Sequence, residues 1–283
     1  MRIDKIVHYL LDARNYQRIA IGISKGGAMM SARRLNLAVP STWEFSGFSQ
    51  NGEDGILDIL RKQLLSQNRY FIEIGAADGV ENNSAWLVIA EKYSGLMVEG
   101  NARLASAARR NVMGYSIGTE VLNCFVTLES IESVIFHARY HDPDVFSLDI
   151  DGNDYYIAKA LLERGLRPKI IVVEYNSAFG PERSATIKYS HKFVMSKHDE
   201  DQLYYGVSIT GWRKLFLSFG YRFITVERNG VNAFFVDPAY FDPKFLNEIG
   251  GIEFGENQYQ LRRYRVPNTE QFSYIEKYPL VDI

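Results

Sequence analysis

Residues 70–79, with the sequence YFIEIGAADG, constrain the fold of this chain more than any other stretch. An apolar run with strand character leads directly into a turn that carries glycine at positions 75 and 79. Glycine adopts positive φ and lets a ligand come close to the backbone, so the turn is typical of a cofactor-binding loop. We expect a helix over residues 83–93, with its N-terminus directed into this turn.

Strand and helix patterns alternate along the chain from about residue 47 onward. Apolar runs recur at 95–99, 120–126, 144–149 and 169–174, with helical patterns before and between them, as at 55–65 and 154–164. A helical pattern at 208–219 then precedes two apolar runs, 221–227 and 231–236, which Asn229-Gly230 joins as in a tight hairpin. The sequence therefore predicts an α/β, Rossmann-like fold with a mostly parallel seven-stranded sheet and an antiparallel last strand.

Carboxylates surround the predicted ligand turn. Glu73 precedes the turn, Asp78 lies in it, and Glu99 ends the next predicted strand. A dinucleotide fingerprint needs glycine where this chain has Ala77 and Val80. The negative charge would repel a pyrophosphate and attract a cationic ligand such as S-adenosylmethionine, which carries an ammonium and a sulfonium. A nucleotide-binding, dehydrogenase-like protein is the alternative.

Three segments together resemble the FkbM-type class I S-adenosylmethionine-dependent methyltransferases. They are residues 49–56 (SQNGEDGI), 71–79 (FIEIGAADG) and 97–101 (MVEGN), and the resemblance extends over about residues 47 to 238. It implies the class I methyltransferase fold, with the glycine turn at the methionine part of the cofactor and Glu99 on its ribose hydroxyls. The residues that we expect to bind the cofactor are Gln50, Glu53, Glu73, Gly75, Ala76, Asp78, Gly79, Glu99, Asn123 and Asp149.

Simpler roles remain open for several of these residues. Glu99 can be a solvated loop carboxylate, and Asp78 can cap a helix. Glu53 can belong to a helix start, where a carboxylate complements the helix dipole.

Acidic and amide side chains follow the fourth and fifth predicted strands. Asp149 and Asp151 come after one, Glu174 and Asn176 after the other, and neighbouring strands bring such ends together. Methyl transfer to oxygen requires a general base or a metal that acidifies the hydroxyl. We expect Asp151, Glu174 and Asn176 to serve in catalysis and to be able to hold Mg²⁺ or another divalent cation.

This arrangement resembles, more weakly, the metal-dependent sugar O-methyltransferases. The chain departs from their pattern because Asn153 stands in place of a second Asp and Glu174-Tyr175 in place of two consecutive Asp. The simpler alternative for Asp149 and Asp151 is a turn that caps the next helix, and Asp154 belongs to the first turn of that helix.

Residues 177–211 form an insertion that is rich in aromatic residues and lysines. A long loop beside a cofactor site is usually a lid or a substrate platform, although aromatic residues also pack cores. His191 and His198 are candidate bases because imidazole titrates near neutrality. We divide the chain into a basic helical extension (1–46), a methyltransferase domain (47–238, with the lid at 177–211) and a C-terminal segment (239–283).

Composition excludes several classes of protein. The net charge of −2 over 283 residues leaves no footprint for nucleic acid, which we exclude as a partner. The single cysteine, Cys124, allows no intrachain disulfide and indicates a reducing compartment. No apolar run reaches the roughly 20 residues that span a bilayer, and the N-terminus lacks a secretory signal. We therefore expect a cytoplasmic protein without a transmembrane segment.

The first forty residues interleave basic and apolar side chains with helical spacing. Such a helix either packs on its own domain or contacts a membrane surface or a partner. Lys25-Gly-Gly-Ala predicts a turn within it.

The sequence as a whole predicts an S-adenosylmethionine-dependent O-methyltransferase that acts on a sugar hydroxyl of a glycan, glycolipid or glycosylated metabolite. The sugar follows from the resemblance and from the aromatic insertion, and a polyketide acceptor would give the same pattern. A noncatalytic scaffold with the same fold is a further alternative. An oligomer is compatible with the sequence.

Overall fold

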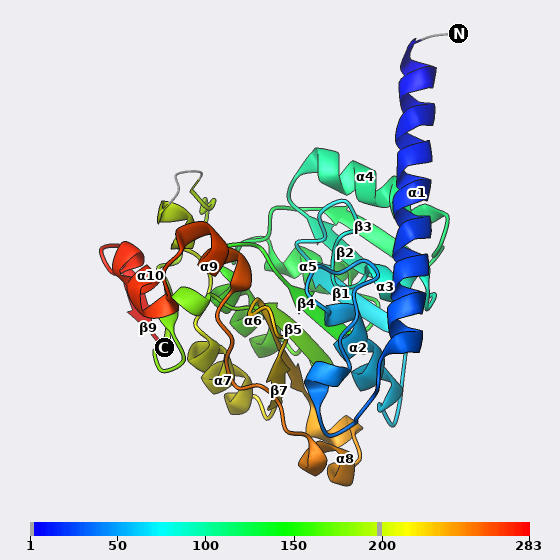
Figure 1. The fold of residues 1–283 in the computed structure, drawn as a ribbon. Coiled ribbons are helices and arrows are strands. Elements are labelled where there is room, and N and C mark those ends of the chain that lie inside the picture. Colours follow the sequence, from blue (N-terminus) through cyan, green and yellow to red (C-terminus); the bar gives the residue numbers. More distant parts are fainter. Residues whose placement is uncertain (1–2, 197–199) are drawn as a thin grey trace.

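The structure, a computed structural model, describes residues 3–196 and 200–283 around one seven-stranded sheet (Figure 1). The strand order is β3-β2-β1-β4-β5-β8-β7. The strands are β1 (Tyr70–Ile74), β2 (Ser94–Glu99), β3 (Thr119–Asn123), β4 (Val145–Leu148), β5 (Ile170–Glu174), β7 (Arg222–Val226) and β8 (Asn232–Val236). Strands β1 to β5 pair in parallel, whereas β8 is antiparallel to both of its neighbours. This is the Rossmann-like α/β fold that the sequence predicts, a mostly parallel seven-stranded sheet, and the Asn229-Gly230 hairpin provides its reversed strand.

Helices cover both faces of the sheet. The helices are α1 (Ile3–Ala32), α2 (Glu53–Lys62), α3 (Ala85–Ile89), α4 (Ala102–Met113), α5 (Ile131–His137), α6 (Asp154–Glu163), α7 (Ile209–Ser218), α8 (Pro243–Glu248), α9 (Gln258–Tyr264) and α10 (Asn268–Ile275). Alternate residues of β1 show the two layers: Phe71 packs with α2, α3 and α4, whereas Ile72 packs with α5, α6 and α7. Because both faces are covered, the central strands are apolar without alternation, which is why their sequence positions were predicted closely.

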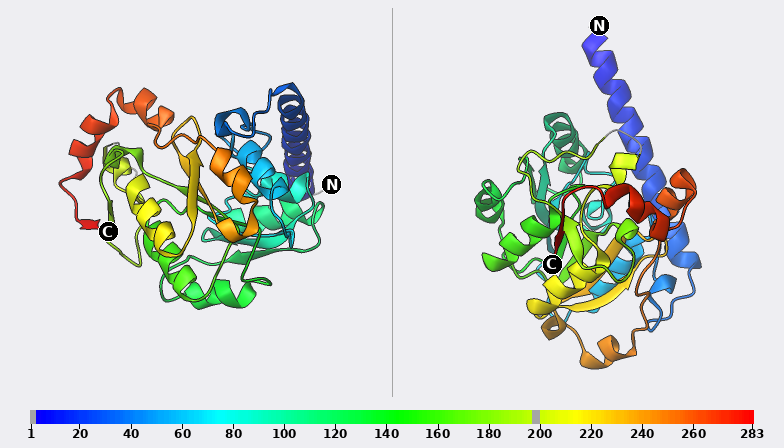
Figure 2. Two further views of the ribbon diagram at one scale, coloured as in Figure 1. Left: turned by 90° about the horizontal axis from the view of Figure 1, so that it is seen from below. Right: turned by 90° about the vertical axis from the view of Figure 1, so that its left-hand side faces the viewer.

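Helix α1 runs without a break through residues 25–28, so the predicted turn at Lys25-Gly-Gly-Ala is wrong. The glycines serve packing instead. A Cβ on Gly26 would lie 2.4 Å from the ring of Trp86, and one on Gly22 would lie 2.4 Å from the ring of Phe48. The second half of α1 packs in this way, and the N-terminal part of the helix extends past the rest of the molecule (Figures 1 and 2).

Within the described residues, no helix is both long enough and apolar enough to cross a lipid bilayer.

The insertion and the C-terminal segment pack on each other at the end of the molecule opposite α1 (Figure 2). Strand β6 (Ala185–Ile187) of the insertion pairs antiparallel with β9 (Leu280–Asp282). Phe179 and Leu203 of the insertion share a small apolar cluster with Ile275 of α10. The insertion is therefore partly regular structure, which its aromatic composition did not predict.

Gly75 allows the ends of β1 and β4 to approach closely. Its φ is 92°, and a Cβ there would lie 1.7 Å from the carbonyl oxygen of Asp149. The group that comes close to this glycine is thus the backbone of Asp149, just after β4. The sequence alone predicts a ligand in that position.

We expect Gly75→Ala to lower the free energy of unfolding by about 3 kcal/mol or more, because it adds a backbone clash to the cost of positive φ. Gly165→Ala is the matched control, since Gly165 has the same φ of 92° but no atom within 4 Å of a Cβ. It should cost only about 1 kcal/mol. Urea denaturation of both variants measures the difference, and equal losses would show that the approach of β4 is not what requires glycine.

Candidate functional site

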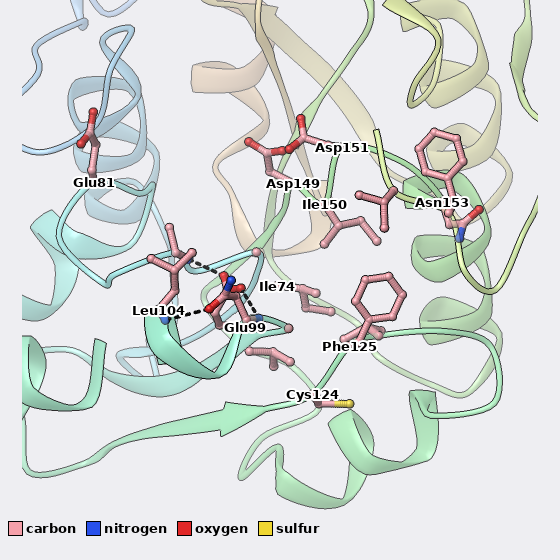
Figure 3. A pocket seen from close by; sticks show the side chains of 18 of the residues that line it. Ile74, Glu81, Glu99, Leu104, Cys124, Phe125, Asp149, Ile150, Asp151 and Asn153 are labelled. Carbon is pink, nitrogen blue, oxygen red and sulfur yellow. Dashed lines mark hydrogen bonds between the residues drawn. The ribbon is translucent and has the colours of Figure 1, made fainter. Parts of the chain in front are cut away.

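A cavity of about 640 Å³ opens at the carboxyl ends of β1, β2 and β4, where ligands bind in open α/β sheets (Figure 3). Its lining residues come from loops that are far apart in the sequence. They are Gln50, Ile74, Gly75, Ala77, Glu81, Val98, Glu99, Gly100, Asn101, Leu104, Cys124, Phe125, Val126, Asp149, Ile150, Asp151, Asn153, Phe193 and Val194. One side is apolar and the other is acidic, with Asp149 and Asp151 above Glu99 in the figure.

Glu99 is held in this cavity by two backbone amides. The N–H of Ala77 donates to Oε2 at 2.8 Å, and the N–H of Asn101 donates to Oε1 at 2.7 Å. Figure 3 shows both hydrogen bonds as dashed lines. The two amides fix the orientation of Glu99. Because each carboxylate oxygen can accept more than one hydrogen bond, Glu99 can still accept from a ligand hydroxyl.

Glu73 occupies the helix N-terminus that follows the glycine turn. Its carboxylate accepts hydrogen bonds from the N–H of Asn83 at 3.0 Å, the N–H of Ser84 at 3.1 Å, and the Ser84 hydroxyl. Burial raises the pKa of Glu73 to about 7. The helix itself begins at Ala85 and ends at Ile89, so the predicted helix over 83–93 is too long, and its N-terminal amides serve an internal carboxylate.

A smaller cavity of about 90 Å³ adjoins the first one behind Gly75 and Asp149. Glu53 lines it and is buried, accepting from the N–H of Asn51 at 2.6 Å and from Nδ2 of Asn232 at 2.8 Å. Gln50 borders both cavities. The predicted residues Gln50, Glu53, Glu73, Gly75 and Asp149 therefore meet in one region.

Four other predicted cofactor residues do not line the large cavity. Asp78 pairs with Arg18 of α1 at 2.6 Å and accepts from the N–H of Val80 in the loop before α3, so it does not cap that helix, which was the simpler role open to it. Asn123 donates to the backbone carbonyl of Glu99 at 2.8 Å. Gly79, with φ of 76°, packs on α4, and Ala76 is buried.

Three carboxylates form a cluster at the ends of β4 and β5. Oxygen atoms of Asp149, Asp151 and Glu174 lie within 4.8 Å of one another. Burial, together with the charges of the neighbouring carboxylates, raises the pKa values of Asp149 and Glu174 well above the usual carboxyl range, and burial raises the pKa of Asp151. Such a cluster holds a proton or a hard cation more readily than isolated carboxylates do.

The loop that carries Asp151 is fixed by Asp154. Asp151 has a φ of 53°, a left-handed conformation that is uncommon outside glycine. The carboxylate of Asp154 accepts from the N–H of Ile150 at 3.0 Å and from the N–H of Gly152 at 2.8 Å. Asp154 also begins α6, as predicted, so one side chain closes the loop and starts the helix.

A short chain of hydrogen bonds ties Tyr205, the neighbour of Glu174, to the C-terminal segment. The buried Tyr205 lies close enough to the Glu174 carboxylate for each group to affect the pKa of the other, and Nε2 of Gln260 donates to the Tyr205 oxygen at 3.0 Å. The Ser177 hydroxyl donates to Oε1 of Gln260 at 3.2 Å. No sequence pattern pointed to Gln260, because it lies in a short helix outside the resemblance.

Asn176 and His191 are placed differently from the acidic cluster. The Asn176 amide is buried, donates to the carbonyls of Leu203 and Tyr205, and accepts from the N–H of Ala178. His191 is exposed and is not among the residues that line the two cavities. His198 lies outside the described residues.

The insertion covers part of the cavity. Asn153 exchanges two hydrogen bonds with the backbone of Ser190, at 2.7 and 3.2 Å. The ring of Phe193 lies so close to Gly152 that a Cβ there would be 2.5 Å away. Phe193 and Val194 thereby add apolar side chains to the lining of the cavity, close to the loop that carries Asp151.

We expect Glu174→Gln to make stability less dependent on pH. In the unfolded wild type, the Glu174 carboxyl ionises near pH 4, whereas in the folded protein it keeps its proton to a higher pH. The free energy of unfolding therefore falls as the pH rises from the unfolded pKa of Glu174 to its folded pKa. The glutamine variant lacks this loss and should unfold at a higher temperature than the wild type at neutral and alkaline pH.

Thermal unfolding between about pH 4 and pH 9 measures this effect. Glu163→Gln, at an exposed position of α6, is the control and should follow the wild type. A Glu174→Gln curve parallel to that of the wild type would contradict a raised pKa at this site.

Comparisons with known proteins find no matching family model and no matching curated protein. Solved structures similar to this chain include an O-methyltransferase from Bacillus cereus in complex with SAH, at 15% identity and TM-score 0.43, covering 77% of this chain and 89% of that one. They also include the O-methyltransferase TomG from Streptomyces achromogenes, in complex with SAM and involved in tomaymycin synthesis, at 15% identity and TM-score 0.44, covering 75% and 94%. Because the likeness is this low, we base the fold class on the strand order and the function on the site.

Proposed function

We propose that this protein is an S-adenosylmethionine-dependent methyltransferase that acts on a hydroxyl of a small-molecule acceptor. The observation that carries the proposal is Glu99, a carboxylate held by two backbone amides at the end of β2 inside a cavity of about 640 Å³. A carboxylate there can accept the two ribose hydroxyls of an adenosyl group. Leu104, Phe125 and Val126 supply apolar walls that suit the adenine.

The charge of the site favours a cationic cofactor over a dinucleotide. The helix N-terminus where a pyrophosphate would bind is used by Glu73. Around Gly75, the carboxylates of Glu53, Glu73 and Asp149 face the smaller cavity, which suits the ammonium of the methionine part.

When bound, S-adenosylmethionine supplies a methyl group on a positively charged sulfur. The chain must hold the acceptor hydroxyl in line with that group, take up its proton and exclude water. Asp151 lines the large cavity and reaches solvent, so it is the carboxylate placed to receive the proton. Although part of Asp151 is exposed, the desolvation of its carboxyl group within the acidic cluster raises its pKa, which brings a carboxylate closer to the proton affinity that a base needs near neutral pH.

For the acceptor we propose a sugar hydroxyl in a glycan, glycolipid or glycosylated metabolite. The apolar side chains of Phe193 and Val194, close to the loop that carries Asp151, suit a sugar ring, which has an apolar face and polar edges. Three carboxylates within 4.8 Å also suit Mg²⁺, which would lower the pKa of a coordinated hydroxyl.

We expect Glu99→Gln to weaken the binding of S-adenosylmethionine and S-adenosylhomocysteine by about 1–3 kcal/mol, because it removes charge-assisted hydrogen bonds to the ribose. Asp78→Asn is the control, since Asp78 lies in the same turn but pairs with Arg18 outside the cavity. The affinity of the Asp78→Asn variant for S-adenosylmethionine should change by less than about threefold. Calorimetric titration of the three proteins, with NAD in parallel, measures both effects.

An unchanged affinity in Glu99→Gln would remove this residue from the cofactor site. Binding of NAD alone would support the dehydrogenase-like alternative, and binding of none of the three ligands would support the noncatalytic scaffold.

We expect a chelator to stop methyl transfer while the affinity for S-adenosylmethionine stays unchanged, because a divalent cation would serve the acceptor and not the cofactor. Transfer of a labelled methyl group to low-molecular-weight acceptors in a cell extract gives the activity, and calorimetry gives the affinity. Asp151→Asn should lower the same transfer by about 10² or more. If activity in the presence of chelator stays at its full level, no metal is required, and Asp151 acts as the base alone.

A further inference from the structure

Two segments of the chain carry cationic residues and no carboxylate. Residues 13–43 contain four arginines and one lysine, all between positions 14 and 34, and residues 102–119 contain three arginines. Neither segment contains Asp or Glu, although the whole chain has a net charge of −2. Positive charge is therefore concentrated in residues 13–34, in α4 and in the loop that follows α4.

These two segments lie side by side. Nδ2 of Asn15 in α1 donates to Oδ1 of Asn111 in α4 at 2.8 Å. Figures 1 and 2 both show the C-terminal end of α4 and the next loop beside α1. The tyrosines Tyr16 and Tyr115 are close enough to influence each other electrostatically, which places the loop after α4 next to the middle of α1.

Most of these cations have no carboxylate to neutralise them. Arg18 pairs with Asp78, and Arg33 pairs with Asp58. The remaining cations form no ion pair with a carboxylate in the part of the chain that the structure describes. They are Arg14, Lys25, Arg34, Arg103, Arg109 and Arg110.

Large apolar side chains stand exposed among these cations. Ile117 is fully exposed, Met113 is 72% exposed and Tyr16 is 67% exposed. Ile23, two helical turns after Tyr16 on the same side of α1, is 37% exposed. Exposed apolar residues next to unpaired cations are the combination that binds at the interface of an anionic membrane, where the cations meet lipid headgroups and the apolar groups enter the acyl boundary.

We propose that residues 13–34 and the segment 102–119 form a cationic surface with which this protein docks on membranes that contain anionic lipids. A second copy of the chain would bring like charges together on this surface, which disfavours self-association. A nucleic acid would satisfy the charges but would leave Ile117 and Met113 in water. Anionic lipid matches both the charge and the apolar groups, and the proposal does not depend on the methyltransferase activity.

The test is flotation of the full-length protein with vesicles of phosphatidylcholine alone and of phosphatidylcholine with an equal amount of phosphatidylglycerol. We expect binding to the anionic vesicles only, with an affinity that falls as salt rises. Arg110→Glu and Lys25→Glu should each weaken binding about fivefold or more, since one basic residue near such a surface contributes about 1 kcal/mol. Ile117→Ser together with Met113→Ser should also weaken binding, by removing the apolar contact.

Matched controls separate this surface from general stickiness. Phe136→Ser and Leu217→Ser remove apolar side chains that are 85% and 72% exposed elsewhere, and both should bind like the wild type. Thermal unfolding checks that every variant is folded. No binding to anionic vesicles at low salt, equal loss in the controls, or binding to RNA in place of vesicles would each overturn the proposal, as would a dimer that the Ile117→Ser, Met113→Ser variant dissociates.

Discussion

The close contact between Gly75 and the backbone of Asp149 sets the arrangement of the whole site. It brings the end of β1 against the end of β4, so the turn after β1 and the acidic residues after β4 share one cavity. Glu99 then enters from β2 on one side, and Glu174 meets Asp149 from β5 on the other. A side chain at position 75 would separate these groups before it affected any ligand.

The sheet and the location of the site were predictable from sequence because each depends on local patterns. Buried parallel strands are apolar throughout, and Asn229-Gly230 specifies its own turn. The glycine turn and Glu99 were identified by adjacent residues, and the structure brings both to the cavity. Which carboxylate faces the cavity was less predictable, because Asp78 turns to Arg18, a residue about sixty positions earlier.

Features that depend on residues distant in the sequence could not be predicted from the sequence. The glycines of α1 predict a turn on local grounds, because the rings that they contact, Phe48 and Trp86, are distant in the sequence. Tyr205 and Gln260 are ordinary residues until the insertion and the C-terminal segment pack together. Asn176 was grouped with the acidic residues because it follows β5, but its amide is used to hold the insertion.

Hydrogen bonds from Ser177 through Gln260 hold Tyr205 beside Glu174, and this has a consequence for how such a chain can diversify. The part of the site around Glu99 depends on the sheet and its first loops, whereas the Glu174 carboxylate depends on residues near the C-terminal end. Replacement of the last helices during evolution would change how Glu174 is presented while leaving Glu99 in place. Chains that share the first half of this molecule would therefore keep the cavity around Glu99 and differ in the surroundings of the acidic cluster.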